Sequence, residues 1–175
     1  MAKIKGSHAV VVGASSGLGR EVAQLLLRQG WHVGLAARRA EPLNDLCRQW
    51  PRSAVAQTID ICRDDAPRQL HNLIDRLGGM NLYFHAAGIG WHNIALDADK
   101  ELSTVSTNAL AFTRMIDAAF SALARNADGG HIAAITSVAG TKGLGAAAAY
   151  SASKAFQSVY LQALDQLAHL RHLPI

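Results

Sequence analysis

Hydrophobic residues along the chain gather in short runs, and longer stretches with a helical spacing of apolar and polar positions lie between these runs. Short apolar runs are typical of strands, whereas apolar residues that recur every three or four positions are typical of helices. We predict strands at residues 8–12, 31–37, 53–60, 81–88 and 131–137. We predict helices at residues 18–30, 40–50, 64–79, 98–126 and 150–170, with glycines at the ends of three of them.

Strand and helix therefore alternate along the chain, and the predicted strands are apolar on both of their faces. Strands of this kind are typical of a parallel sheet that is covered by helices on each side. We predict the α/β class, with one doubly wound (Rossmann) parallel sheet in a three-layer α/β/α arrangement and right-handed crossovers. The sequence shows no linker, low-complexity stretch or second domain, so we predict a single domain over residues 1–175.

The composition agrees with one globular domain that has a substantial core. The chain has 175 residues, of which 50% are hydrophobic and 17% charged, with 15 glycines. The net charge of +4 is spread along the chain without a long run of like charges, which argues against a nucleic-acid partner. A basic pocket for an anionic small ligand would give the same charge balance.

The cysteines and the N-terminal residues bear on the compartment. Cys47 and Cys62 are isolated from each other, which favours a reducing compartment without disulfides, and we expect both thiols to be buried. The apolar run near the N-terminus is too short for a signal peptide, and no stretch approaches the ~18 apolar residues of a membrane-spanning helix. We therefore predict a cytoplasmic protein without a membrane partner. The histidines have no metal-binding spacing, so we predict no metal site.

The first predicted strand runs directly into the turn G-A-S-S-G-L-G at residues 13–19. Glycines between a strand and a helix let the backbone approach a phosphate, which the free N–H groups of the helix N-terminus can bind. Serine hydroxyls add further donors. We predict a phosphate-binding turn, and a tight turn that needs glycine only for its geometry is the alternative. The predicted contacts are Gly13, Ser15, Ser16, Gly17, Leu18 and Gly19.

The end of the second predicted strand carries arginines instead of an acidic residue. In dinucleotide-binding folds this position lies beside the adenine ribose, where an acidic residue binds the 2′-hydroxyl of NAD. Here the sequence reads G-L-A-A-R-R, and the guanidinium groups of Arg38 and Arg39 could bind a 2′-phosphate. NADP(H) is therefore favoured over NAD(H). Two solvated arginines are the alternative, although cations are mildly unfavourable at a helix N-terminus.

Tyr150 and Lys154 are four residues apart in a predicted helix, so they share one of its faces. A free tyrosine is a poor acid at neutral pH because its pKa is ~10, but a nearby ammonium stabilises the phenolate. Such a pair can exchange a proton with a carbonyl or alcohol oxygen. Ser137 ends the fifth predicted strand, at the edge of the sheet where ligands bind, and could polarise the same oxygen.

Together these motifs resemble the short-chain dehydrogenase/reductase family in its compact single-domain form. The resemblance runs from residue 7 to the end of the chain. The glycines of the turn at 13–19 are similar to the family's cofactor turn. Asp60 and Ile61 after the third predicted strand resemble its adenine-contacting pair of an acid and an aliphatic residue. The residues that resemble its active site are Asn108 in S-T-N-A-L-A, Ser137, Tyr150 and Lys154.

The resemblance implies an NADP(H)-dependent oxidoreductase that acts on a small carbonyl or alcohol substrate. Tyr150 would be the general acid in ketone reduction or the base in alcohol oxidation, and Lys154 would lower its pKa and bind the nicotinamide ribose. Both residues are therefore also expected cofactor contacts. Ser137 would position the substrate oxygen, and Asn108 would hold a water that links Lys154 to solvent. The nicotinamide of NADPH would supply the hydride, so the protein groups mainly position and polarise.

The chain departs from the family after the fourth predicted strand, where H-A-A-G at residues 85–88 replaces N-N-A-G. Gly88 is kept, so we expect the same backbone path, with Ala86, Ala87 and Gly88 bordering the adenine ribose. His85 could form hydrogen bonds in place of the first asparagine. A strand-end histidine bound to neighbouring backbone is the simpler interpretation, and we do not expect a catalytic base there.

The resemblance also has consequences for the C-terminal residues H-L-P-I and for assembly. In the family a sixth strand begins near this point, and the segments after it supply most of the substrate pocket. We therefore expect an NADP-binding Rossmann domain that ends near the start of that strand. A shortened, non-catalytic NADP-binding or scaffold protein is the alternative function. The family's helices that correspond to 98–126 and 150–170 pack across a two-fold axis, so we predict a homodimer or homotetramer.

Overall fold

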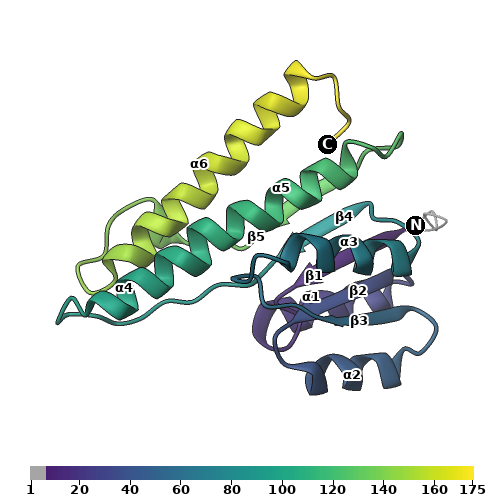
Figure 1. Cartoon of the computed structure of the whole chain (residues 1–175), viewed down its shortest axis with the longest axis horizontal. Coiled ribbons are helices and arrows are strands. Elements are labelled where there is room, and N and C mark those ends of the chain that lie inside the picture. The colour runs from purple at the N-terminus through teal and green to yellow at the C-terminus, as the bar shows by residue number, and fades with distance from the viewer. Residues whose placement is uncertain (1–6) are drawn as a thin grey trace.

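The computed structural model of the protein describes residues 7–175, which form one parallel sheet with helices on both faces (Figure 1). The strands are β1 (His8–Val12), β2 (His32–Ala37), β3 (Ala54–Thr58), β4 (Leu82–His85) and β5 (His131–Ala134). All neighbouring strands are parallel, and their order in the sheet is β3-β2-β1-β4-β5. The predicted doubly wound fold is therefore confirmed. The strand order reverses between β1 and β4, and the carboxyl edge at that point is where such sheets bind ligands.

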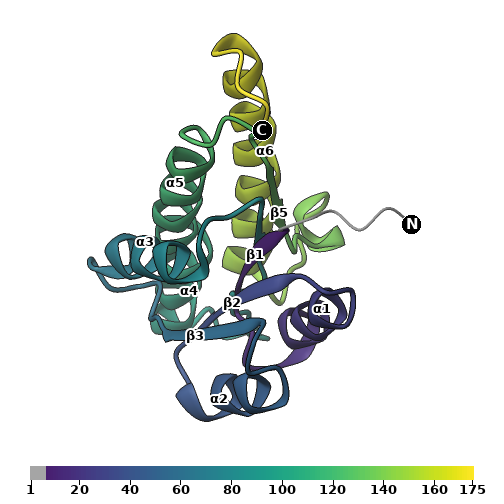
Figure 2. The ribbon, with the colours of Figure 1, turned by 90° about the vertical axis from the view of Figure 1, so that its right-hand side faces the viewer.

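The helices are α1 (Gly17–Arg28), α2 (Ala40–Gln49), α3 (Ala66–Leu77), α4 (Ala98–Val105), α5 (Phe112–Leu123) and α6 (Ala148–Leu170). Two shorter elements complete the chain, a π-helix η1 (Ser106–Ala111) and a 3-10 turn η2 (Val138–Gly140). Figure 2 shows α1 and α2 on one side of the sheet, and α3 and α5 on the other. Helix α6 packs on the same side as α5, and the two long helices lie side by side in both views. None of the helices within residues 7–175 has the length and apolar character needed to span a bilayer.

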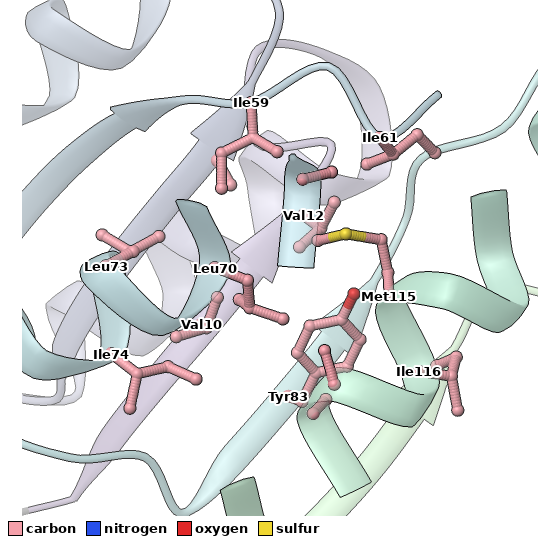
Figure 3. Close-up of a cluster of buried hydrophobic side chains, with 14 of the residues drawn as sticks. Val10, Val12, Ile59, Ile61, Leu70, Leu73, Ile74, Tyr83, Met115 and Ile116 are labelled. Atoms are coloured by element: carbon pink, nitrogen blue, oxygen red, sulfur yellow. The ribbon is translucent and has the colours of Figure 1, made fainter. Parts of the chain in front are cut away.

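The core explains why the strands are apolar on both faces. Val10 and Val12 of β1 pack with α3 and α5, whereas Ala9 and Val11 face α1 and α2. Figure 3 shows the first of these clusters, in which Tyr83 of β4 lies between the sheet and α5. Burial of side chains on both sides fixes β1 at the centre of the sheet, so the turn that follows it opens at the middle of the carboxyl edge.

Three expectations from the sequence need correction, two about the helices and strands and one about the cysteines. The strands are shorter than predicted: β4 ends at His85 and β5 at Ala134, because the chain leaves the ladder to form the loops at the carboxyl edge. The helix predicted over 98–126 ends at Leu123 and contains the π-helix η1 in its middle. Such π segments are rare and often occur at functional sites. Cys62 is exposed and Cys47 is half-buried, so the expectation of two buried cysteines is wrong.

The last residues of the chain turn back toward the sheet. The carbonyl of Pro174 accepts a hydrogen bond from Gly130 N at 3.0 Å, immediately before β5. Ile175 packs against the same side-chain cluster as α5 and α6. The last residues therefore lie beside the start of β5. The assignment of residues 1–175 as one domain that ends near the start of the family's sixth strand stays a prediction.

Candidate functional site

A cleft of about 520 Å³ lies at the carboxyl edge of β1, β2, β3 and β4, at the point where the strand order reverses. It is bounded by the glycine turn, the arginines after β2, the segment after β3 and the start of the loop after β4. Its lining residues are Val12, Gly13, Ser15, Ser16, Ala37, Arg38, Arg39, Ile59, Asp60, Ile61, Cys62, Ala86, Ala87, Gly88, Ile89 and Thr107. Most of the predicted cofactor contacts are thus brought together in one cleft.

The three glycines of the turn serve different purposes. A side chain at Gly13 would place its Cβ 2.6 Å from Ala87 N, and one at Gly19 would place it 2.4 Å from Gly13 O. These two positions need glycine because backbone segments pack closely there. Gly17 has a left-handed φ of 54°, and a Cβ added there would meet nothing within 4 Å, so this position needs glycine for its backbone conformation, although it is not among the residues that line the cleft. Ser16 precedes α1 without capping it, which leaves the first N–H groups of the helix available to an anion.

The two arginines after β2 are placed differently from each other. Arg39 donates hydrogen bonds from Nη2 to Ser15 Oγ at 3.2 Å and to Ser16 Oγ at 3.0 Å. Arg38 lines the same cleft but has no such bond among residues 7–175. The guanidinium of Arg39 therefore joins the end of β2 to the glycine turn. Positive charge and hydroxyl groups meet at one place, which suits a phosphate ligand.

The segment after β3 contributes Asp60 and Ile61, as predicted, and also Cys62. Asp60 Oδ1 accepts a hydrogen bond from Cys62 N at 3.1 Å, which holds the segment in a tight turn. Arg114 of α5 fixes this turn by donating to Cys62 O and to Asp64 Oδ1. Sequence reasoning missed Cys62, although its position directly after the Asp60–Ile61 pair would have indicated it.

Lys154 is almost fully buried beneath the end of the sheet. Its Nζ donates to Ile135 O at 2.8 Å and to Gln157 Oε1 at 2.9 Å, and it lies 5.8 Å from the centre of the Tyr150 ring. Burial lowers the pKa of Lys154, because removal from water disfavours the charged form. Tyr150 and Lys154 therefore lie close together on one face of α6, as their spacing predicts.

Asn108 lies in η1 and is completely buried. Its Oδ1 accepts from Ile89 N at 2.9 Å, and its Nδ2 donates to Ile89 O at 2.7 Å and to Ser153 Oγ at 3.1 Å. The side chain therefore joins the loop after β4 to helix α6. Its backbone carbonyl accepts a further hydrogen bond from Gln157 Nε2 at 2.8 Å.

The loop after β4 lies directly against the catalytic candidates. A Cβ at Gly88 would be 3.6 Å from Lys154 Nζ, and one at Gly90 would be 2.6 Å from Cδ2 of Tyr150. Ser137 caps η2, and its Oγ accepts from Ala139 N at 3.1 Å. Ser137 thus lies three residues beyond the end of β5 at Ala134. Among the described residues, its side chain makes no hydrogen bond to Tyr150. The turn η2 nonetheless packs on α6, because Gly140 approaches the backbone of Lys154 closely.

His85 occupies the end of β4 and is 2% exposed. Its Nδ1 is 3.0 Å from the hydroxyl of Tyr83, and its ring meets Phe112 edge-on, whereas Nε2 is buried without a hydrogen-bond partner within residues 7–175. The Tyr83 hydroxyl is thus a side-chain partner that the sequence interpretation did not include, and the backbone of Ala87 also favours the protonated ring. Burial, helped by the positive charge of Lys154, lowers the pKa of His85 to about 3. The ring is neutral near pH 7 and unsuited to act as a base.

A parallel sheet with this strand order and this cleft defines a Rossmann-type fold, and comparison with known proteins identifies the family. The sequence profile of the short chain dehydrogenases matches residues 7–171. The chain therefore belongs to the short-chain dehydrogenase family, as the sequence motifs indicate.

Relatives of known sequence include an uncharacterized oxidoreductase of Myxococcus xanthus. It is 33% identical over 170 residues, which cover 94% of this chain and 67% of that protein. The human 3-oxoacyl-[acyl-carrier-protein] reductase is 31% identical over 147 residues, or 82% of this chain and 62% of the reductase. This chain thus spans about two thirds of the length of these relatives.

Solved structures agree with the fold. A variant of actinorhodin polyketide ketoreductase with NADPH superposes with a TM-score of 0.83 at 27% identity, covering 94% of this chain and 66% of the ketoreductase. The closed form of a serine dehydrogenase complexed with NADP+ has a TM-score of 0.84 at 21% identity, covering 93% of this chain and 66% of the dehydrogenase. The second likeness concerns the fold alone.

Proposed function

We propose that the chain binds NADP(H) and transfers a hydride between the nicotinamide and a carbonyl or secondary alcohol, with Tyr150 as the general acid or base. The observation that carries this proposal is the buried ammonium of Lys154, 5.8 Å from the Tyr150 ring and at the same sheet edge as the glycine turn. A buried cation beside a phenol stabilises the phenolate, which is what proton exchange with an alcohol oxygen requires.

The residues of the cleft fit the proposed cofactor. The open backbone at Gly17 and the uncapped start of α1 suit the pyrophosphate, while Arg38 and Arg39 suit a 2′-phosphate. Asp60 and Ile61 border the part of the cleft proposed for adenine. NADPH in the similar polyketide ketoreductase structure supports the same choice of cofactor. When bound, NADPH supplies the hydride.

The remaining steps belong to the protein's own side chains. An ammonium has three N–H donors, and Lys154 uses two of them on Ile135 O and Gln157 Oε1. The third is left for a ribose hydroxyl or the oxygen of Tyr150. In carbonyl reduction, Tyr150 gives its proton to the developing alkoxide, and Ser137 is proposed to donate a hydrogen bond to the same oxygen. Asn108 holds the loop after β4 against α6, so that Tyr150 stays in position.

The proposed substrate is a small carbonyl or secondary alcohol compound. Support comes from the names of a 3-oxoacyl-[acyl-carrier-protein] reductase and a polyketide ketoreductase among the similar proteins. We also propose a homodimer or homotetramer. Exposed apolar side chains on α4, η1 and α6 support this assembly, namely Leu102, Val105, Leu110, Phe156 and Val159.

The first experiment is titration of the protein with NADPH and, separately, NADH, followed by nicotinamide fluorescence, and then turnover with a panel of ketones. NADPH should bind more tightly than NADH. Tyr150→Phe should lower kcat by at least about 100-fold and change NADPH affinity far less, because the proton donor is lost while the residues proposed to bind the phosphates remain. Tyr160→Phe removes a hydroxyl from the same helix and is the matched control. NADPH binding without turnover of any substrate would instead support a non-catalytic NADP-binding or scaffold protein.

A further inference from the structure

We infer that Gln157 is a positioning residue for the proposed reaction: its side-chain amide bridges the Lys154 ammonium and the Asn108 carbonyl, and so directs the ammonium toward Tyr150. This inference rests on the proposed function of Tyr150 and Lys154. Gln157 lies one turn after Lys154 on α6 and is 1% exposed. Neither the family motifs nor the charge pattern draws attention to it.

The amide of Gln157 can be oriented in only one way. Its Oε1 is 2.9 Å from Lys154 Nζ and its Nε2 is 2.8 Å from Asn108 O. An ammonium can only donate and a backbone carbonyl can only accept, so the oxygen must face Lys154 and the nitrogen must face Asn108. Both ends of a buried amide are thereby satisfied, and the position of the ammonium is coupled to η1, the π-helix that carries Asn108.

Gln157 offers Lys154 an uncharged hydrogen-bond acceptor, and this affects the electrostatic field at Tyr150. The hydrogen-bond acceptors of Lys154 are Ile135 O and Gln157 Oε1, both neutral. The titratable groups that face its ammonium are Tyr150 on α6 and His85 on β4, and His85 is neutral near pH 7. A carboxylate in place of the amide would hold the ammonium equally well but would cancel its charge. Gln157 therefore keeps Lys154 in place and leaves its positive charge uncompensated beside Tyr150.

The bridge also changes the expected connection from Lys154 to solvent. The family resemblance implies a water between Lys154 and Asn108, whereas here the link from Nζ to the Asn108 carbonyl runs through a side-chain amide. A hydroxyl or water can accept one proton and release another, but an amide does so only by forming its unstable imidic tautomer. In our proposal Gln157 orients Lys154 and does not relay protons toward Asn108.

The test uses two substitutions of similar length, Gln157→Met and Gln157→Glu, with the exposed Gln162→Met on the same helix as control. Phenolate formation is followed by ultraviolet absorbance in the protein without cofactor, and Tyr150→Phe identifies the contribution of Tyr150. The other two tyrosines do not interfere, because burial raises the pKa of Tyr83 and burial with Asp117 raises the pKa of Tyr160 to about 12.

We expect both substitutions at position 157 to move the midpoint of Tyr150 ionisation upward by about one to two pH units. Methionine removes a hydrogen bond that stabilises the ammonium, whereas glutamate neutralises the charge of the ammonium. The loss of one such interaction corresponds to a shift of about this size in the ionisation midpoint. Gln162→Met should have no effect. The pH profile of alcohol oxidation with NADP+ should shift in the same direction as the absorbance midpoint.

A purely structural role would lower the melting temperature of the variants without moving the midpoint, and that result would overturn the inference. Gln157→Glu is close to the natural residue in volume, so it serves if the methionine variant does not fold. The absorbance titration needs no substrate. Absence of turnover in the natural protein would therefore count against the proposed function, while the titration would still decide the role of Gln157.

Discussion

The Nη2 atom of Arg39 lies 3.0 Å from Oγ of Ser16, so the end of β2 is hydrogen-bonded to the turn that precedes α1. Arginine at the start of a helix is electrostatically unfavourable by itself. Here α2 begins with Arg39 at its N-cap, and the guanidinium reaches away from the helix to the serines. The contact places a cation and two hydroxyls around one point of the cleft, where a 2′-phosphate is proposed to bind.

Arg39→Ala should weaken NADPH binding by about 10- to 100-fold, because hydrogen bonds to charged groups contribute about 1.5–3 kcal/mol. NADH has no 2′-phosphate, and its affinity should change little. Fluorescence titration of both cofactors measures the difference. Arg38→Ala tests the neighbouring arginine, and Arg28→Ala at the exposed end of α1 controls for the loss of one positive charge. Equal losses for NADPH and NADH would show that Arg39 does not recognise the phosphate.

Gly90→Ala should impair catalysis more than cofactor binding. The new Cβ would lie 2.6 Å from Cδ2 of Tyr150, so either the ring or the loop after β4 must move. A displaced Tyr150 no longer reaches the substrate oxygen, and kcat should fall by about 10-fold or more, since catalysis is sensitive to displacements near 1 Å. NADPH affinity should stay within about 3-fold, because the atoms nearest to the new Cβ all belong to the Tyr150 ring and the residues proposed to bind the phosphates stay in place.

Gly143→Ala is the matched control for this substitution, because a Cβ at Gly143 meets nothing within 4 Å. Steady-state kinetics of the two variants, with NADPH titrations in parallel, separate displacement of Tyr150 from a general effect of replacing a loop glycine. An unchanged kcat in Gly90→Ala would show that the loop adapts without moving the tyrosine.

Sequence reasoning predicted the features that depend on local pattern. The apolar runs located each strand, and the glycines at 13, 17 and 19 located the turn, because both reflect requirements of the backbone itself. It could not place Arg39 rather than Arg38 against the serines, since that depends on the direction in which α2 leaves the sheet. The π-helix at Asn108 was missed for a similar reason: its wide turn is held by contacts to Ile89 and α6.

Other omissions were within reach of the sequence. Tyr83 and His85 are two residues apart in a strand, so their side chains point to the same face, and their hydrogen bond could have been anticipated. Gln157 lies three residues after Lys154 and shares its face of α6. A polar side chain beside a buried lysine indicates a partner, but only the packed structure shows that its other end meets Asn108.

Protonation of His85 should destabilise the protein in acid. Its pKa is about 3 in the native state, against 6.5 for an unperturbed histidine. Above pH 6.5 both states hold a neutral ring and this residue gives no pH dependence. Between pH 6.5 and about 3 the unfolded chain binds a proton that the native state does not, so the free energy of unfolding falls as the pH falls. The slope from one proton is at most about 1.4 kcal/mol per pH unit.

His85→Asn removes this titration. Between pH 4 and pH 6.5 the slope of the free energy of unfolding against pH should therefore fall by on the order of 1 kcal/mol per pH unit. Urea unfolding at a series of pH values measures this slope. The control is His169→Asn, which makes the same replacement at an exposed position of α6. A profile of His85→Asn that runs parallel to that of the natural protein would mean that His85 is protonated in the folded state or that other groups dominate acid unfolding.

The proposed assembly can be tested through the exposed apolar side chains of α6. Val159 is 63% exposed and lies on the same helix as the half-exposed Phe156. An aspartate at Val159 would carry its charge into any interface built on this surface, where burial of an unpaired charge is strongly unfavourable. Val159→Asp should therefore shift the protein from dimer or tetramer toward monomer at micromolar concentration, as measured by light scattering after gel filtration.

The control is Leu25→Asp, which replaces an exposed apolar side chain of α1 on the other side of the sheet and should leave the molar mass unchanged. If the natural protein is already a monomer at that concentration, the proposal of a homodimer or homotetramer is wrong. If Leu25→Asp dissociates the assembly and Val159→Asp does not, the interface lies on the side of α1.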